Sequence, residues 1–368
     1  MEEMLDAVRF WMDLGIDGFR LDAVPYLIEA EGTNCENLPG THKILKQLRA
    51  MVDEEYPGRI LLCEANQWPD DVVEYFGNGD ECQMAFHFPV MPRLYMGLRR
   101  GSRECISEIL AHTPHIPDGC QWGTFLRNHD ELTLEMVTEE DRHYMWEEYA
   151  PESRWRCNLG IRRRLSPLVD NDDAKIRLLN AMLLSLPGSP VLYYGDEIGM
   201  GDDPWLPDRD GVRTPMQWDD SETAGFSTAL PEDFHLPLIR TFGHDPEHVN
   251  VARQMDDPSS LLVWTRAMLG IRRHHPVFGT GEFTDLGGPD MAVMSFLRHN
   301  EHETVLCLAN FSDTERMVAL HLPQFAGMTG SSLIHGQDAQ PVKADGTLSV
   351  PLWPYGYRWL QVSREERS

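Results

Sequence analysis

Residues 16–22 have the sequence Ile-Asp-Gly-Phe-Arg-Leu-Asp, a short apolar run that closes on charged side chains. Apolar residues precede it at helical spacing over positions 5–14, and Gly15 is a common signal for a helix end. A second helical pattern covers residues 42–55 and leads to Arg-Ile-Leu-Leu-Cys-Glu at 59–64, which again stops at a carboxylate. The chain therefore opens with two units in which a helix leads into a buried strand.

The same alternation of strand and helix continues toward the middle of the chain. Strands are predicted at 84–87, 124–130 and 190–194, and helices from 69, over 92–112, over 174–186 and over 261–274. Apolar strands that alternate with helices indicate parallel pairing with both faces of the sheet covered. The chain contains neither GxGxxG nor GxxxxGK[ST], so five such units favour a (β/α) barrel over a doubly wound nucleotide-binding sheet.

The pattern changes after about Pro276, where short alternating runs are separated by Gly, Asp and Pro. Strands are predicted there at 291–297, 304–311, 317–322, 331–335 and 348–350. We therefore expect two domains: residues 1–275 form a partial (β/α) catalytic barrel, and residues 276–368 form a small antiparallel, β-sandwich-like domain. Residues 200–257 are rich in Asp, Pro and Gly and are predicted to form a long loop at the top of the barrel.

The amino-acid composition indicates which classes of molecule the protein is suited to bind. The formal charge is −27, from 32 basic and 59 acidic residues, and such a surface repels nucleic acid and anionic membranes. A small neutral substrate or simple solubility both fit this excess of acid. The seven cysteines are odd in number and form no CxxC pair, which predicts reduced thiols and a cytoplasmic protein. The amphipathic N-terminal segment predicts neither a signal peptide nor a membrane span, and oligomeric state leaves no mark on the sequence.

Three acidic residues lie at or just beyond the ends of predicted strands: Asp22, Glu64 and Asp130. An isolated acid at such a place is more often a turn or a helix cap. The carboxyl ends of parallel barrel strands all face one rim, so these three acids are expected to share a pocket. Retaining glycoside chemistry needs a nucleophilic carboxylate and a carboxylic acid about 5–5.5 Å apart.

Neighbouring residues support this interpretation. Arg20 lies two positions before Asp22, on the same face of the strand, where it would keep the carboxylate ionised as a nucleophile requires. Glu64 follows an apolar run, a setting that raises a carboxyl pKa as an acid catalyst requires. His129 precedes Asp130 and could donate hydrogen bonds to sugar hydroxyls. The sequence carries no HExxH or GxSxG motif, and Leu206 at the first ligand position rules out an EF-hand at 206–211.

Three ordered segments resemble the catalytic signatures of the α-amylase superfamily, glycoside hydrolase family 13. They are Gly-Phe-Arg-Leu-Asp-Ala at 18–23, Glu-Ala-Asn at 64–66 and Phe-Leu-Arg-Asn-His-Asp at 125–130. Segments similar to one subgroup of that family, the trehalose synthases or maltose α-D-glucosyltransferases, lie at 24–29, 32–39, 80–88 and 158–165. The motif at 210–218, Asp-Gly-Val-Arg-Thr-Pro-Met-Gln-Trp, is shared with many α-glucosidase relatives. The resemblance covers nearly the whole chain.

The resemblance implies a role for each matched residue. Asp22 would be the nucleophile, Glu64 the general acid/base, and Asp130 the carboxylate that grips sugar hydroxyls at the transition state. The substrate-binding residues that it implies are Arg20, His129 and Arg213. The implied reaction is the interconversion of maltose and trehalose by retaining transglucosylation, with some hydrolysis to glucose. A hydrolytic α-glucosidase with the same catalytic residues, and an inactive or scaffolding relative, are the alternatives.

The resemblance also implies a fold of eight strands, a (β/α)8 TIM barrel, of which this chain carries only about strands 4–8. We therefore expect an N-terminally incomplete chain, a fragment or one that another chain completes. No cofactor is implied for the residues present and no metal ligands are predicted; where full-length relatives hold calcium, its main site would lie in the missing part. The partners implied are maltose and trehalose, with a maltokinase left open as a partner or fused domain.

Several single features stay ambiguous at this level. Trp122, Trp205 and Trp218 could stack on sugar rings, although core packing is the commoner role of tryptophan. His87 at a strand end could face a pocket or be a hydrogen-bonded core histidine. The basic run Arg-Arg-Arg at 162–164 is typical of a solvated face or of internal ion pairs.

Overall fold

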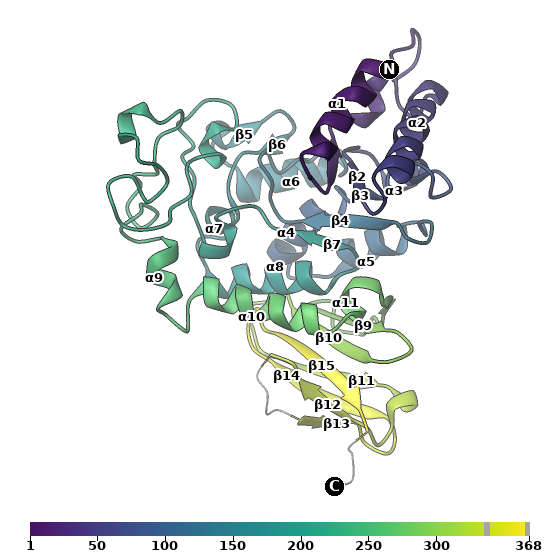
Figure 1. Ribbon diagram of the computed structural model, residues 1–368. Helices are drawn as coiled ribbons and strands as arrows, with labels where there is room; N and C mark the ends of the chain where they lie inside the picture. Colours follow the sequence, from purple (N-terminus) through teal and green to yellow (C-terminus); the bar gives the residue numbers. More distant parts are fainter. Residues whose placement is uncertain (335–338, 365–368) are drawn as a thin grey trace. The chain divides into compact units, whose positions relative to one another are not determined.

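The computed structural model describes residues 1–334 and 339–364. The chain divides into two compact units, of which the first comprises residues 1–90 and 109–124 and the second comprises residues 91–108 and the chain from 125 onward. Figure 1 colours the chain along its sequence, so the first unit is purple to blue and the second runs to yellow. The expected domain boundary at 275/276 stays a prediction.

A parallel sheet forms the centre of the first unit. Its strands are β1 (Gly18–Leu21), β2 (Ile60–Cys63), β3 (Met84–Phe86) and the first residues of β4 (Gln121–Phe125). Neighbouring strands are all parallel: Leu21 pairs with Cys63 and Met84 pairs with both Leu62 and Gln121. The predicted order and direction of these strands are confirmed.

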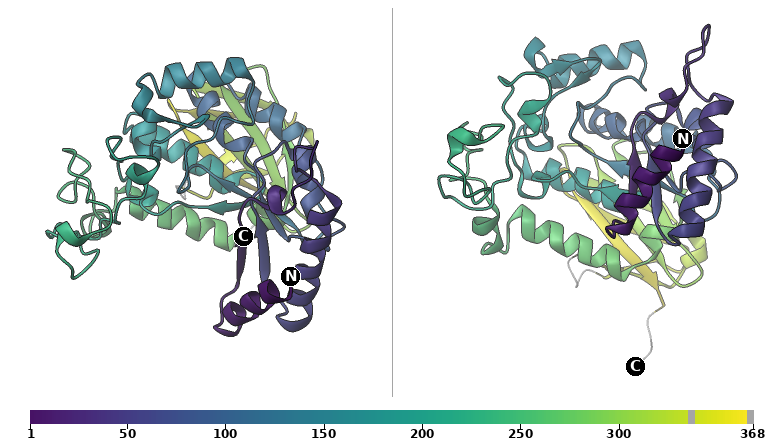
Figure 2. Two further views of the ribbon diagram at one scale, coloured as in Figure 1. Left: turned by 90° about the horizontal axis from the view of Figure 1, so that it is seen from above. Right: turned by 45° about the horizontal axis from the view of Figure 1, so that its top comes forward.

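Helices α1 (Glu2–Asp13) and α2 (Pro39–Glu55) cover this sheet (Figure 2). Gly15 follows α1 with a φ of 93°, and Pro39 occupies the first turn of α2, where its missing N–H costs nothing. Shorter helical segments are η1 (Val24–Leu27), α3 (Pro69–Val72) and η2 (Val73–Phe76). The core of the unit joins apolar side chains of both long helices to those of the strands, among them Met12, Leu45, Val52, Leu61, Phe76, Ala85 and Trp122.

The helix predicted over residues 92–112 is wrong as a single element. The structure has two helices there, α4 (Val90–Arg100) and α5 (Glu104–Ala111). Gly101 between them has a φ of 61°, a left-handed conformation that ends a helix and that glycine adopts without strain. Helical periodicity on both sides of this break concealed it at the level of sequence.

The strand predicted over residues 124–130 is wrong at its C-terminal end, because β4 stops at Phe125. The Asn128 side chain accepts a hydrogen bond from the amide of Asp130, and the Arg127 guanidinium donates to the Asp130 carbonyl. Both hydrogen bonds give the backbone groups of Asp130 a partner within the same segment, in place of the interstrand hydrogen bonds that a longer β4 would make. Residues 127–130 therefore form a turn that presents polar side chains.

In the second unit the long helices begin where capping residues predict. Asp172 caps α8 (Asp173–Ser185) and Ser260 caps α10 (Leu261–His274), each accepting hydrogen bonds from first-turn amides. The remaining elements before residue 281 are α6 (Glu139–Tyr149), η3 (Ser153–Trp155), β5 (Arg156–Cys157), β6 (Gly160–Ile161), α7 (Leu165–Leu168), β7 (Ser189–Val191), η4 (Asp196–Ile198), η5 (Asp210–Val212), η6 (Pro231–Asp233), α9 (Val251–Met255) and α11 (Val277–Thr280). As predicted, residues 200–257 are almost wholly irregular.

The C-terminal region is an antiparallel β-structure, as predicted (Figure 1). A six-stranded sheet has the order β13-β12-β15-β10-β9-β8, and β11 (Arg316–His321) pairs with β14 (Thr347–Leu352). The sheet strands are β8 (Glu282–Asp285), β9 (Val293–His299), β10 (Thr304–Asn310), β12 (Thr329–Ser332), β13 (Ala339–Pro341) and β15 (Tyr357–Ser363). The sequence analysis missed β8, β13 and β15, and the end of its predicted strand at 331–335 lies outside the described residues.

All seven cysteines are free thiols, which agrees with the predicted reduced state. Within residues 1–334 and 339–364, no helix combines the length and the hydropathy that a membrane crossing requires.

Candidate active site

Asp22 and Glu64 occupy equivalent places at the ends of adjacent strands. Leu21 and Cys63 are paired across β1 and β2, so each carboxylate is the first residue beyond its strand. The amide of Glu64 donates to the carbonyl of Leu21, and this bond extends the ladder to the residue that carries the side chain. Parallel register alone therefore brings the two acids to the same edge of the sheet.

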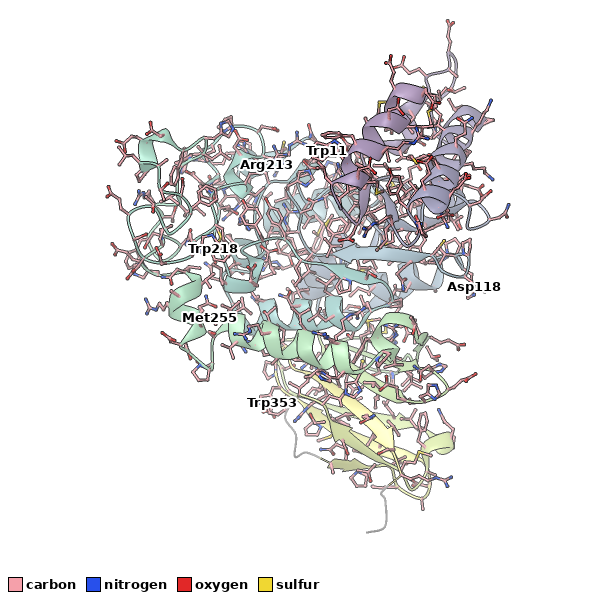
Figure 3. All side chains as sticks on the ribbon, viewed as in Figure 1. Trp11, Asp118, Arg213, Trp218, Met255 and Trp353 are labelled. Atoms are coloured by element: carbon pink, nitrogen blue, oxygen red, sulfur yellow. The ribbon has the colours of Figure 1, made fainter. Side chains whose placement is uncertain are left out.

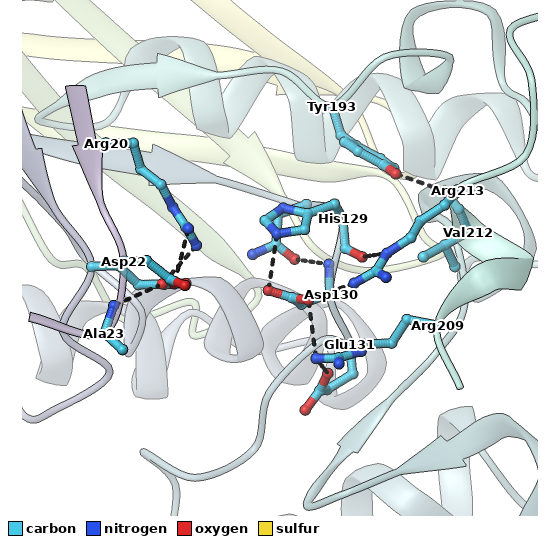
Figure 4. A network of polar contacts seen from close by, with 12 residues as sticks. Arg20, Asp22, Ala23, His129, Asp130, Glu131, Tyr193, Arg209, Val212 and Arg213 are labelled. Carbon is cyan, nitrogen blue, oxygen red and sulfur yellow. Dashed lines mark hydrogen bonds and ion pairs between the residues drawn. The ribbon is translucent and has the colours of Figure 1, made fainter. Parts of the chain in front are cut away.

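Arg20 links the two carboxylates, and Figure 4 shows it beside Asp22. Its Nη1 atom donates to Oδ1 of Asp22 at 2.9 Å, and its Nη2 atom lies 2.6 Å from Oε2 of Glu64. The Asp22 side chain is 75% exposed whereas that of Glu64 is 16% exposed. The pair thus has one accessible carboxylate beside a cation and one largely buried carboxyl.

The pKa of Glu64 is raised to about 7: burial is the largest cause, a hydrogen bond with the Asp22 side chain also raises the pKa, and the charge of Arg20 lowers it. A carboxyl with this pKa holds its proton near neutrality and can give it to a leaving oxygen. The direction predicted from the apolar sequence before Glu64 is confirmed. The hydrogen bond to Asp22 is a second cause that the sequence did not reveal.

The residue after Asp22 has a strained backbone. Ala23 has φ 46° and ψ 42°, a left-handed conformation that costs a non-glycine residue about 1 kcal/mol. Its amide lies 3.5 Å from Oε2 of Glu64, and the next amide, that of Val24, donates to the Glu64 carbonyl. The turn aims two backbone donors at Glu64, which explains why the strain is retained.

The third predicted acid, Asp130, lies in the second unit within a group of cationic side chains (Figure 4). Arg213 donates from Nη2 to Oδ1 of Asp130 at 2.9 Å and from Nε to the carbonyl of His129 at 2.7 Å. Nε2 of His129 lies 3.3 Å from Oδ2 of Asp130. The structure therefore brings together His129, Asp130 and Arg213, which the sequence analysis had selected separately.

The sequence analysis did not select Arg209, yet this residue contacts the same carboxylate. Its Nη1 atom donates to Oδ1 of Asp130 at 3.1 Å and lies 3.5 Å from Oε2 of Glu131. Two guanidinium groups thus share one carboxylate oxygen. The available signal in the sequence was its position, four residues before Arg213 and directly before the motif at 210–218.

Buried arginine fixes the turn that carries Asp130. Arg127 is 1% exposed, and it donates from Nη2 to the Asp130 carbonyl at 2.7 Å and from Nε to the carbonyl of Arg163 at 2.6 Å. These bonds tie the turn to a second segment of the same unit. Asp130 is therefore fixed at two places: Arg127 binds its backbone carbonyl, and Arg213 binds its carboxylate.

Arg213 also borders a cavity of about 450 Å³ within the second unit. Aromatic side chains of the irregular segment line it, including Trp218, Phe226 and Phe234. Trp218 is 50% exposed, and Figure 3 shows it on the same segment as Arg213. Half-exposed aromatic rings beside a cationic donor are the type of surface on which a sugar ring can stack.

The structure shows which of the other ambiguous residues are buried in the core and which are exposed. Trp122 is buried in the core of the first unit, and His87 is a core histidine whose Nε2 lies 2.8 Å from the hydroxyl of Thr113. Trp205 is 79% exposed and carries the Arg154 guanidinium on its ring. Arg162, Arg163 and Arg164 make internal contacts, with Asp202 pairing to Arg163 and carbonyl groups binding Arg162.

Each unit therefore holds one group of predicted site residues: Arg20, Asp22 and Glu64 in the first, and His129, Asp130 and Arg213 in the second. That all three acids surround one sugar carbon stays a prediction. Among residues 1–334 and 339–364, no three His, Cys, Asp or Glu side chains gather in a geometry that could hold a metal ion.

Two family descriptions match the sequence. Residues 1–151 and 157–281 match "Alpha amylase, catalytic domain", and residues 287–359 match "Maltogenic Amylase, C-terminal domain". The first match covers most of the chain, including every predicted site residue.

Curated relatives are similar over nearly the whole chain. The "Trehalose synthase/amylase TreS" of Mycobacterium tuberculosis is 56% identical over 99% of this chain and 62% of its own length. The "Trehalose synthase" of Pimelobacter sp. is 55% identical over 98% of this chain and 65% of its own length. The chain thus spans less than two thirds of the length of these relatives.

Solved structures have the same fold at low sequence identity. The α-amylase from H. orenii superposes with a TM-score of 0.74 at 19% identity, covering 98% of this chain and 64% of the other. The trehalulose synthase MutB from Pseudomonas mesoacidophila superposes with a TM-score of 0.71 at 22% identity, covering 98% and 68%. These matches confirm the fold class, a catalytic barrel followed by an antiparallel β-domain.

Proposed function

This chain belongs to the α-amylase catalytic-domain family, and on that basis we propose that it interconverts maltose and trehalose by retaining transglucosylation. The support from sequence is 55–59% identity to three curated trehalose synthases. The support from structure is the Arg20-bridged pair of Asp22 and Glu64, a hydrogen-bonded carboxyl and carboxylate with unlike environments. That pair carries the proposal because retaining chemistry needs one acid in each role.

The first half of the reaction cleaves maltose. Glu64 protonates the glycosidic oxygen while a carboxylate oxygen of Asp22 attacks the anomeric carbon of the non-reducing glucose ring, which stays on the enzyme. The bond from that carbon to the glycosidic oxygen breaks, its electron pair stays with the oxygen, and glucose is released next to a glucosyl-Asp22 ester. Arg20 donates a hydrogen bond to the attacking carboxylate of Asp22, and Glu64, with its pKa of about 7, starts as the acid.

The second half rebuilds a disaccharide. The ionised Glu64 takes the proton of the anomeric hydroxyl of the freed glucose, whose oxygen attacks the glucosyl-Asp22 ester. Two inversions leave an α,α-1,1 linkage, and the Asp22 carboxylate is regenerated. If water attacks instead, the product is glucose, so exclusion of water decides the ratio of trehalose to glucose. The chemistry uses side chains alone and needs no cofactor.

We assign substrate binding to the group in the second unit. Asp130 would accept hydrogen bonds from sugar hydroxyls, with His129 and Arg213 as donors to the same ring. Neutral disaccharides suit these paired charges, since neither sign is left unbalanced. With its free thiols and acidic surface the protein would act in the cytoplasm, with residues 1–275 as the catalytic domain and residues 276–368 as the β-domain.

The test compares two leaving groups. The chain is supplied with maltose, and trehalose and glucose are quantified by NMR, then with α-glucosyl fluoride, whose fluoride departs without protonation. Asp22→Asn should lower turnover of both substrates by at least about a thousandfold, because no ester can form. Glu64→Gln should lower maltose turnover by about 10²–10⁴-fold and fluoride release far less.

Asp118→Asn, an exposed acid in a loop of the first unit, serves as the control and should retain wild-type rates. Near-normal maltose turnover by Asp22→Asn would overturn the assignment of the nucleophile. If wild-type protein gave glucose as its sole product, the enzyme would be a hydrolytic glucosidase and the proposed transferase function would be wrong.

A further inference from the structure

Two tyrosines of the second unit contact the backbone on both sides of Arg213. The hydroxyl of Tyr193 donates to the carbonyl of Val212 at 2.7 Å, and that of Tyr194 donates to the carbonyl of Thr214 at 2.6 Å. Figure 4 shows the first of these bonds next to the Arg213 side chain. The residue between the two carbonyls is the one that binds Asp130 and the His129 carbonyl.

Arg164 holds the two tyrosines. It is fully buried, and its guanidinium carbon lies 4.7 Å from the centroid of each tyrosine ring. Nη1 of Arg164 donates to the Tyr194 carbonyl at 2.7 Å and lies 3.5 Å from Oδ1 of Asp196. A cation stacked on two rings and bonded to the carbonyl of the second tyrosine leaves the hydroxyls little freedom.

Gly195 makes room for this arrangement. Its φ is 86°, and a Cβ atom at this position would lie 2.4 Å from the sulfur of Met200 and 3.1 Å from Nη1 of Arg164. The turn at Gly195 thus lets the chain reverse directly beneath the guanidinium. A side chain at this position would clash with Met200 and crowd the Arg164 guanidinium.

The segment that carries Arg213 has little regular secondary structure to fix its backbone. It belongs to the irregular region 200–257, where one short 3₁₀ turn, η5, comes immediately before Arg213. Val212 and Thr214 are buried, so their carbonyls need partners inside the protein. The tyrosine hydroxyls provide them, and they come from a segment that follows strand β7.

From this geometry we infer that Tyr193 and Tyr194, clamped by Arg164, are positioning residues for Arg213. They fix the peptide groups on both sides of it, so that its side chain reaches Asp130 and the His129 carbonyl together. Neither tyrosine need touch substrate. The kinetic part of the test rests on the proposed function, whereas its spectroscopic part does not.

The kinetic part uses Tyr193→Phe, Tyr194→Phe and the double variant, each of which removes only hydroxyl groups. Each single change should lower kcat/KM for maltose about threefold to tenfold, mainly through KM, because one bond of about 1 kcal/mol is lost. The double variant should approach Arg213→Met. In the Arg213→Met background the tyrosine changes should have no further effect on kcat/KM.

Tyr149→Phe is the matched control, since its hydroxyl makes a 2.7 Å bond to the carbonyl of Tyr95 elsewhere in the same unit. It should lower Tm as the test variants do and leave kcat/KM unchanged. An equal loss of kcat/KM in Tyr149→Phe, or full additivity with Arg213→Met, would show that the tyrosines act on stability only.

The spectroscopic part needs no turnover. The Nε–H group of Arg213 donates to the His129 carbonyl, so its ¹⁵N–¹H resonance, assigned by its loss in Arg213→Lys, should exchange slowly in wild-type protein. The double phenylalanine variant should lose that protection by at least about tenfold, and Tyr149→Phe should keep it. Unchanged protection in the double variant overturns the inference; a lack of maltose turnover alongside lost protection would count only against the proposed function.

Discussion

The Nη2 atom of Arg20 lies 2.6 Å from Oε2 of Glu64, yet the pKa of Glu64 is raised to about 7. Burial of the carboxyl is the largest cause and outweighs the attraction of the cation. Arg20 therefore limits a pKa that would otherwise rise further, and so keeps Glu64 able to act as base in the second half-reaction.

Replacing Arg20 should change this pKa in a known direction. The Arg20→Met substitution removes the positive charge that lowers the pKa of Glu64, so this pKa should rise by about one unit. A ¹³C NMR titration of the Glu64 side chain measures it directly. Arg59→Met removes an arginine that pairs with Asp17 in the same unit and should leave the titration unchanged. A lower pKa in Arg20→Met would mean that the cation does not oppose the effect of burial on Glu64.

Glu64 should also make stability depend on pH. Its folded pKa of about 7 lies above the ordinary value of 4.5, so the native state binds the proton more tightly than the unfolded chain. This contribution is present below about pH 4.5 and is lost as the pH rises through 7. Glu64→Gln, which cannot ionise, should therefore have a higher free energy of unfolding than wild type at pH 8, by about 1–2 kcal/mol after allowance for partial exposure.

The advantage of Glu64→Gln should shrink toward zero at pH 5, as measured by urea unfolding at both values. Glu3→Gln, at an exposed position of α1, should show no such difference. An advantage independent of pH would mean that packing, and not ionisation, accounts for the effect.

Arg209 should matter for binding, but less than Arg213. Both donate to Oδ1 of Asp130, whereas only Arg213 also holds the His129 carbonyl. Arg209→Met should raise KM for maltose about tenfold with a small change in kcat, and Arg213→Met should have the larger effect. Arg154→Met removes an arginine stacked on exposed Trp205 and should leave KM unaltered. Steady-state kinetics decides the order of the two arginines.

Arg298 should be essential for stability. It is 1% exposed and donates to the carbonyls of Ser185, Leu186 and Gly281. Arg298→Met would leave these acceptors unpaired and should cost about 3–5 kcal/mol of unfolding free energy. Arg273→Met, at an exposed position of α10, should cost less than about 0.5 kcal/mol. Urea unfolding of the two variants gives the comparison, and equal midpoints would refute this role.

The sequence was most informative where one apolar run decides an element. Residues 16–22 and 59–64 were predicted as parallel strands, the structure has them at 18–21 and 60–63, and parallel register places Asp22 beside Glu64. The same reasoning overextended β4, because Leu126 continues the apolar run while Asn128 turns the backbone through a side-chain bond. Strand β15 was missed because its alternation is broken by Arg358, which is buried in the structure.

The second group of site residues was only partly predictable. Asp130 was selected by its position at a predicted strand end and Arg213 by resemblance, but the contact between them spans 83 positions and depends on an irregular segment without periodicity. Arg209 and the two tyrosines joined the site through that segment's backbone path. The backbone path of such a segment depends on its turns and on the partners of its buried carbonyls. The hydrophobic pattern of the sequence does not predict it.

Gly195 has a practical consequence for protein engineering. Libraries that diversify residues 203–218 to alter the product ratio can leave the supporting turn unchanged. The hydroxyls that anchor the loop belong to Tyr193 and Tyr194, and they bind main-chain carbonyls of the loop, so the bonds do not depend on the loop's side chains. Diversifying position 195 instead would introduce a clash with Met200 and Arg164 in every non-glycine clone. Apart from Arg209 and Arg213, the loop is therefore open to redesign, provided that Tyr193, Tyr194 and Gly195 stay unmutated.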